Sequence, residues 1–263
     1  MSDRIIKFTL VFSLLLSCLN KVQGSEPKSL IFTVNSPGSF PYLYFDSSKQ
    51  SYAGLIPDFF GDLEQQGIYK VVYVDSNQLR SEQFVIEGKV DLHLANRRWL
   101  KQPEKVIASI SIVQHLTFLY SLTHFDDDFS IEALVDKKIC TQQEFIYTGL
   151  QQSFITKKLE RLDSSNQATI ASMLTKGRCD YAILNNYNAT SIFHETEFCH
   201  LAIHQSPQPT SDIDLTILMR PELHAAKNII DAHLETFISS GKVDKSLLSH
   251  SPKPSFPKIA TCH

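Results

Sequence analysis

Three cations follow a short apolar run, and their spacing suggests that they could hold an anion. The run Leu92-His93-Leu94-Ala95 has the composition of a buried strand, and Arg97 and Arg98 come directly after it, with Lys105 further on. A guanidinium can bind a carboxylate or phosphate through two parallel hydrogen bonds, whereas an ammonium supplies a point charge. We therefore expect one of the arginines to contact a ligand. A solvated loop is the alternative, and both arginines remain candidates.

Aromatic residues form a second group of candidate ligand contacts. The proline-containing segment 40–44 carries Phe40, Tyr42 and Tyr44, and Trp99, the only tryptophan, follows the arginines. Aromatic rings stack on planar or apolar parts of ligands. We expect these four side chains to form walls of a binding cleft, with ordinary core packing as the alternative.

A stretch rich in metal-ligating residues does not have metal-site spacing. It includes His194, Glu195, Glu197, Cys199, His200 and His204. On a strand, His200 and His204 would lie about 13 Å apart, too far to share one ion. The chain also lacks a glycine-rich phosphate loop, a His-Glu-x-x-His helix and a nucleophile elbow. We expect no metal, no cofactor and no catalysis.

Composition indicates an ordinary folded protein that does not bind nucleic acid. The 263 residues are 43% hydrophobic and 20% charged, with a formal net charge of −3. A long disordered protein would contain fewer apolar residues, and a nucleic-acid binder would carry a basic excess.

The first 24 residues have the plan of a secretory signal peptide. Arg4 and Lys7 precede the apolar run 8–16, and Val22-Gln23-Gly24 offers small side chains at a cleavage site. A lipoprotein anchored through Cys18, or a buried N-terminal helix, is the alternative. Cleavage removes three basic residues and one acidic residue, so the charge changes from −3 to −5. No later segment has the length of a membrane span, and we expect a periplasmic monomer.

Export would place the four remaining cysteines in an oxidising compartment. These are Cys140, Cys179, Cys199 and Cys262, which allow three full pairings. We favour Cys179 with Cys199, because each precedes a predicted strand. Free buried thiols are the alternative.

The mature chain alternates strands with helices in two series. In the first, predicted strands at 30–34, 71–74 and 90–95 enclose helices at 56–66 and 81–88. In the second, strands at 138–141, 181–184, 201–203 and 214–219 alternate with helices at 145–161, 169–176, 192–196 and 222–239. Such alternation predicts parallel sheets with right-handed crossovers, arranged as two α/β lobes.

Six motifs in order resemble one known family. They are the aromatic loop Phe40–Asp46, the segment Gly54–Asp58, Gly88–Leu92, Pro103-Glu104-Lys105, Gly177–Ala182 and Arg220–Leu223. Together they resemble the family 3 solute-binding proteins of bacterial periplasmic transport systems, which have the type II periplasmic-binding fold. The resemblance covers nearly all of the mature chain.

The resemblance implies a domain layout and a position for the ligand. Lobe 1 would comprise residues 25–119 and the return segment 213–250, lobe 2 residues 120–212, and the C-terminal tail residues 251–263. Two crossover strands, near Leu119–Ser121 and Asp212–Leu215, would join mainly parallel sheets and allow hinge closure. The ligand would lie at the carboxyl ends of strands, between the lobes.

Three departures from the family pattern concern ligand recognition. Lys105 stands where amino-acid-binding members have an arginine for the α-carboxylate. Asn185 stands where they have a carboxylate for the α-ammonium. The loop usually read as Gly-Thr-Thr is here Gln143-Glu144-Phe145-Ile146, which makes Glu144 and Phe145 candidate contacts. These departures argue against the usual α-amino-acid specificity.

We therefore expect a solute-binding protein that captures a small polar or anionic metabolite, amino-acid-like or a carboxylate, for an ABC-type permease. One alternative is an exported sensory or accessory binding protein. Another is a dehydratase-like enzyme of the same fold, with Glu144 as a general acid or base.

Overall fold

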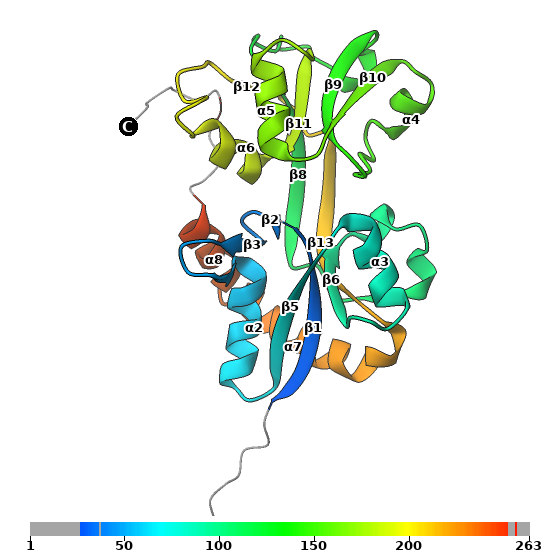
Figure 1. Cartoon of the computed structure of the whole chain (residues 1–263), viewed down its shortest axis with the longest axis vertical. Helices are drawn as coiled ribbons and strands as arrows, with labels where there is room; N and C mark the ends of the chain where they lie inside the picture. Colours follow the sequence, from blue (N-terminus) through cyan, green and yellow to red (C-terminus); the bar gives the residue numbers. More distant parts are fainter. Residues whose placement is uncertain (1–26, 37, 252–255, 257–263) are drawn as a thin grey trace, which may run out of the picture.

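The protein consists of two α/β lobes connected by a pair of long strands (Figure 1). The computed structural model describes residues 27–36, 38–251 and 256. The predicted signal peptide, Cys18 and Cys262 lie outside these residues. The arrangement of strands and helices confirms the predicted fold class, two α/β lobes with mainly parallel sheets.

Lobe 1 is built on a four-stranded sheet covered on both faces. Its strands are β1 (Lys28–Asn35), β5 (Tyr69–Ser76), β6 (Leu92–Ala95) and β13 (Ser211–Met219). β1 is parallel to β5 and β6, and β13 is antiparallel to β6. Helices α2 (Leu55–Gln65), α7 (His224–Ser239) and α8 (Lys242–His250) cover one face, and α3 (Gln78–Ile86) covers the other. Short strands complete the lobe: β2 (Gly38–Ser39), β3 (Leu43–Asp46) and β4 (Ser51–Ala53) form a separate sheet, and β7 (Ile107–Ala108) pairs with β13.

Helix α2 shows why the pattern folds this way. Its residues Ile56, Phe59, Phe60 and Leu63 recur at helical spacing, and all four are buried. They pack against the sheet, where Phe32 of β1 meets the ring of Phe60 edge-on at 5.9 Å. Burial of one apolar stripe therefore fixes the helix on the sheet.

Lobe 2 repeats the same arrangement. Its strands are β9 (Lys137–Gln142), β10 (Leu159–Ser164), β11 (Tyr181–Asn185) and β8 (Val113–Ser121), with β12 (His204–Gln205) on the edge of β8. β9 is parallel to β10 and β11, while β8 is antiparallel to β11. Helices α5 (Gln167–Thr175) and α6 (Asn186–Phe193) cover one face. The other face is covered by the segment containing Phe125 and Leu134 and by residues near α4 (Gln151–Ile155).

The two lobes are joined where β8 and β13 pair with each other. Antiparallel pairing runs from Ser211 opposite Thr117 to Leu215 opposite Val113. The first crossover predicted at Leu119–Ser121 is on the same strand but lies inside lobe 2, because Leu119 already pairs with Ile183 of β11. The part of β8 that pairs with β13 is therefore Val113–Thr117, just before the predicted crossover.

One predicted helix is partly wrong. The helix expected over 145–161 is limited to α4, and its last residues belong to strand β10. β10 pairs along its whole length with β9, from Leu159 opposite Lys137 to Ser164 opposite Gln142. The backbone N–H and C=O groups of this segment form their hydrogen bonds with the neighbouring strand β9. This pairing outweighs the local preference of its residues for a helix.

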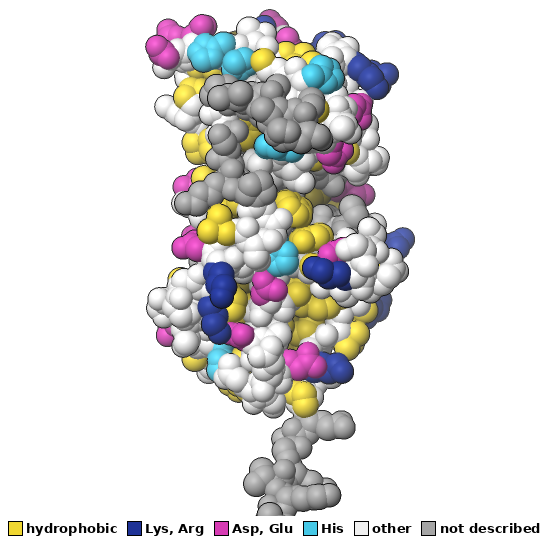
Figure 2. All heavy atoms as spheres, turned by 90° about the vertical axis from the view of Figure 1, so that its left-hand side faces the viewer, with side chains coloured by type: hydrophobic (Ala, Val, Ile, Leu, Met, Phe, Trp, Pro, Cys, Tyr) yellow, Lys and Arg dark blue, Asp and Glu magenta, His cyan; other side chains and the backbone are white. Residues whose placement is uncertain are grey.

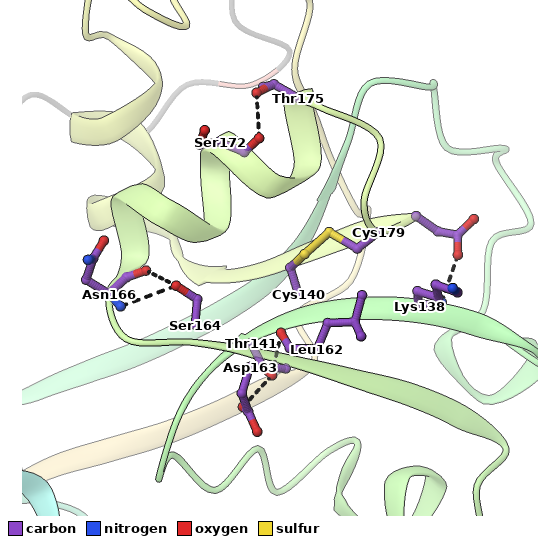
Figure 3. Close-up of a disulfide and its surroundings, with 11 residues drawn as sticks. Lys138, Cys140, Thr141, Leu162, Asp163, Ser164, Asn166, Ser172, Thr175 and Cys179 are labelled. Carbon is purple, nitrogen blue, oxygen red and sulfur yellow. Dashed lines mark hydrogen bonds between the residues drawn. A yellow bond between two sulfur atoms is a disulfide. The ribbon is translucent and has the colours of Figure 1, made fainter.

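The structure also corrects the predicted disulfide. Cys179 is bonded to Cys140, with Cα atoms 5.8 Å apart, instead of to Cys199 (Figure 3). Cys140 lies on β9 opposite Ala182 of the adjacent β11, and Cys179 stands just before β11 begins. The pairing of two neighbouring strands therefore brings these sulfurs together, under helix α5. Cys199 takes part in a different disulfide.

No helix in the described part of the chain is both long and apolar enough to cross a bilayer. Nor do three or more His, Cys, Asp or Glu side chains gather anywhere in residues 27–36, 38–251 and 256 as a metal site would require.

Candidate functional site

A cavity of about 80 Å³ lies between the lobes and is the candidate ligand site. Both lobes and both crossover strands contribute to its walls. Lobe 1 supplies Asn35, Ser39, Gln78, Leu94 and Trp99, the crossovers supply His115, Thr117, Ser211 and Leu215, and lobe 2 supplies Phe145, Ile146, Tyr147, Gln167, Ile183, Leu184 and Asn185.

The ends of strands place several of these residues. Asn35 is the last residue of β1, Asn185 is the last residue of β11, and Trp99 follows β6. Because parallel strands end at the same edge of a sheet, their carboxyl ends from both lobes face the space between them. This is the edge at which the sequence predicts the ligand.

Asn185 is held rigidly by the helix that it begins. Its Oδ1 accepts a hydrogen bond from the backbone N–H of Asn188 at 2.8 Å, which caps α6. The residue is only 3% exposed, and its Nδ2 has no hydrogen-bond partner among the described residues. One face of this amide is therefore structural, and the other leaves a donor free at the cavity.

Two glutamines occupy equivalent positions in the two lobes. Gln78 begins α3 after the capping residue Asn77, and Gln167 begins α5 after the capping residue Asn166. The caps accept hydrogen bonds from Arg80 N at 2.9 Å and from Thr169 N at 2.8 Å. Helix α3 follows β5 and helix α5 follows β10, each an outermost strand of its sheet, so the same turn brings one glutamine to the cavity from each side.

Gln167 is further fixed by neighbouring amides. Its Oε1 accepts from Nδ2 of Asn188 at 2.7 Å, and its Nε2 donates to Oε1 of Gln142 at 3.2 Å. A primary amide has two donors and two acceptor lone pairs, so Gln167 keeps one of each for a ligand.

His115 lies at the crossover, inside the cavity wall. It is 8% exposed, and its Nδ1 has no hydrogen-bond partner within the part of the chain that the structure describes. Its ring contacts Trp99 edge-on at 5.7 Å and Tyr42 at 5.7 Å. Burial lowers the pKa of His115 to about 4, so the imidazole is neutral at physiological pH.

The cavity contains no charged side chain among its described lining residues. Its polar groups are amides, hydroxyls and the neutral imidazole, and the remaining walls are aliphatic and aromatic. Charges lie further out: a neighbouring cavity of about 290 Å³, which shares Trp99 and Phe145, is bordered by Glu82, Lys101 and Glu144.

The structure brings some of the predicted site residues together. Trp99, Phe145 and Asn185 line the central cavity, and Glu144 lines the outer one. Phe40 and Tyr44 line a third cavity, of about 320 Å³, which Gln167 separates from the central one. The three cavities are neighbours, because Trp99 and Phe145 line both the first and the second and Gln167 lines both the first and the third.

Tyr42 and the three predicted cations are placed elsewhere. Tyr42 is fully buried in the lobe 1 core. The guanidinium of Arg97 donates to the carbonyls of Pro103 at 2.7 Å and Val106 at 2.8 Å, so it holds its own loop together. Neither Arg98 nor Lys105 lines the central cavity, and Lys105 borders a groove on lobe 1.

The face seen in Figure 2 carries interspersed charges of both signs and no extended basic area.

Sequence reasoning missed His115, Asn35, Gln78 and Gln167. The glutamines carry a usable signal, because Ser76-Asn77-Gln78 and Ser165-Asn166-Gln167 repeat the same tripeptide after equivalent strands. His115 has no local signal, since its role depends on the pairing of β8 with β13.

Known structures share this architecture. A probable amino-acid ABC transporter extracellular-binding protein, ytmK from Bacillus subtilis, superposes with a TM-score of 0.68 at 16% identity over 86% of this chain and 98% of that one. The substrate-binding protein AbpA from Streptococcus pneumoniae, bound to L-arginine, gives 0.68 at 15% identity over 84% and 94%. The fold is that of the type II periplasmic-binding proteins.

This fold is not confined to transport. A histidine kinase sensor domain with similarity to periplasmic-binding proteins gives a TM-score of 0.69 at 13% identity, over 86% of this chain and 96% of that one. No family profile and no curated protein matches the sequence.

Proposed function

We propose that this protein is an exported solute-binding protein that captures a small polar solute between its lobes. The observation that carries the proposal is the central cavity, whose walls come from both lobes and from both crossover strands. A ligand there would contact both lobes and both crossover strands. Its binding energy would therefore favour the closed arrangement of the lobes. The predicted signal peptide would deliver the protein to the periplasm.

The partner is proposed to be an ABC-type permease in the inner membrane. The similarity of the fold to binding proteins of such transporters supports this role. A second candidate is a sensory or accessory binding protein, which the similarity to a kinase sensor domain supports. Neither role requires catalysis, and the proteins of known structure compared above are binding proteins and a sensor domain.

A ligand screen with the mature chain, residues 25–263, tests the proposal. Thermal shift against amino acids, carboxylates, sugars and nucleobases should find saturable stabilisation, and small-angle scattering should show a smaller radius of gyration with the ligand bound. Phe145→Ala should abolish the response because Phe145 lines the cavity. Phe45→Ala is the matched control, since Phe45 is 43% exposed on β3.

The same screen tests whether the ligand is anionic, as Arg97, Arg98 and Lys105 led us to expect. Loss of binding in Arg98→Ala or Lys105→Ala would show that those side chains reach the ligand on closure. If no compound stabilises the protein and co-purification yields only a protein partner, the solute-binding role is wrong.

A further inference from the structure

The polar groups that face the central cavity are uncharged and come from both lobes. Gln78 and Gln167 approach from equivalent helix starts, and Asn35 and Asn185 from the ends of strands. Four primary amides around one small space supply both donors and acceptors. No ion pair could form with any of them.

One fully buried polar atom at this cavity lacks a partner among the described residues: Nδ1 of His115, in a side chain that is 8% exposed. Nδ2 of Asn185, in a residue that is 3% exposed, also has no hydrogen bond to a described residue. Buried polar groups are nearly always hydrogen-bonded, because an unmade bond costs free energy. The side chain of Gln78, which is half-buried, also makes no hydrogen bond to a described residue, so its amide is available to a ligand from lobe 1.

A charged ligand group would be poorly accommodated here. Closure of the lobes removes water from the ligand, and a desolvated charge needs an opposite charge or several hydrogen bonds directed at it. No described lining residue of the central cavity is acidic or basic, and Glu82, Lys101 and Glu144 line the neighbouring one. The guanidinium of Arg161 donates instead to the carbonyls of Gln142 and Phe145. Burial keeps His115 neutral, so it does not supply the missing cation.

We infer that the central cavity selects an uncharged molecule with hydrogen-bonding groups on one side and an apolar or planar face on the other. The amides and His115 satisfy the polar groups, and Trp99 and Phe145 contact the apolar face. This inference rests on the proposed function. Neutral monosaccharides and nucleobases share this chemistry, whereas α-amino acids and carboxylates do not.

Isothermal titration calorimetry of the mature protein tests the class of ligand. The probes are neutral monosaccharides, uncharged nucleobases and nucleosides, charged amino acids and dicarboxylates. We expect saturable binding by a member of the neutral sets, and which set binds identifies its source. Saturable binding restricted to amino acids or carboxylates would overturn the inference and leave the solute-binding role intact. Absence of binding in every set would overturn both.

Asn185→Asp is the decisive variant. Aspartate retains the acceptor that caps α6, so folding is preserved, but it replaces the free Nδ2 donor with a negative charge. We expect at least a tenfold loss of affinity for the neutral ligand, measured at a temperature where circular dichroism shows that the variant is folded. Gln152→Glu is the control, because Gln152 is exposed on α4 in the same lobe and lines no part of the cleft. Equal affinity of Asn185→Asp and wild type would contradict the inference.

Discussion

Tyr42 of lobe 1 and Tyr187 of lobe 2 meet edge-on, with ring centroids 6.0 Å apart and ring planes at 79°. Tyr187 stands in the first turn of α6, yet it packs against the core of lobe 1. The contact therefore holds the lobes together at a point outside the crossover strands. The cis peptide bond Phe40-Pro41 precedes Tyr42 in this segment.

Tyr187→Ala should shift the protein toward a more open arrangement. An edge-to-face aromatic pair contributes about 0.5–1.5 kcal/mol beyond its buried area, so affinity for a ligand that needs closure should fall by up to about tenfold. Small-angle scattering of the ligand-free protein should give a larger radius of gyration. Tyr187→Phe keeps the ring and should behave as wild type. An unchanged radius in Tyr187→Ala would show that the contact does not restrain the lobes.

Two buried histidines predict acid sensitivity. Burial lowers the pKa of both His93 and His115 to about 4, below the ordinary value of 6.5. Between these values the unfolded chain binds more protons than the native protein, so stability falls as pH decreases from about 6.5 to 4. Each histidine contributes up to about 1.4 kcal/mol per pH unit.

The contribution of His115 to this pH dependence is the difference in the free energy of unfolding between wild type and a variant without the histidine. Urea unfolding of wild type and His115→Gln at several pH values should show a shallower pH dependence in the variant, because glutamine does not titrate. Carboxylates that titrate in the same range affect both proteins equally. Parallel curves would mean that His115 is not kept neutral by the fold.

The disulfide of lobe 2 should contribute to stability but not to ligand binding. Cys140 and Cys179 are 39 residues apart in sequence, and closing a loop of this length stabilises the native state by about 2–4 kcal/mol. We expect Cys140→Ala with Cys179→Ala to lower the melting temperature while ligand affinity is retained, since neither residue lines the cleft. Peptide mapping of the unreduced protein should find these two cysteines linked. A linked Cys179–Cys199 peptide would contradict the structure.

Local sequence patterns predicted helices and strands more successfully than they predicted contacts between distant segments. The spacing of Phe59 and Leu63 was enough to predict α2, because a helix needs only one apolar stripe to be placed on a sheet. The segment of β10 could not be assigned from its own residues, since its backbone bonds depend on β9.

The site illustrates the same distinction. Trp99 and Phe145 follow strands and Asn185 ends one, and strand ends can be predicted from the sequence. The direction of Arg97 was not visible, because its partners are the carbonyls of a loop whose path is set by tertiary packing. The charge of Arg97 alone therefore did not indicate that the side chain bonds its own loop.

Phe256 provides a further restraint on the lobes. Residues up to Ser251 are held on lobe 1, where Tyr44 donates to Nδ1 of His250 at 3.0 Å and Nε2 of His250 lies 3.0 Å from Asp58. Phe256 instead packs in the lobe 2 core, 5.0 Å from the ring of Tyr120. The five residue steps between Ser251 and Phe256 span at most about 18 Å, so the docked ring limits how far the lobes separate.

Phe256→Ala should release this restraint. Loss of a partly buried aromatic ring should reduce stability by about 1–3 kcal/mol, and the ligand-free protein should have a larger radius of gyration than wild type. Phe45→Ala, an exposed aromatic substitution on lobe 1, should leave the radius of gyration unchanged. A double variant with Tyr187→Ala should open further than either single variant, because the two contacts lie on different elements of lobe 2. If Phe256→Ala lowers stability while the radius stays at the wild-type value, Phe256 serves only the lobe 2 core and does not restrain the lobes.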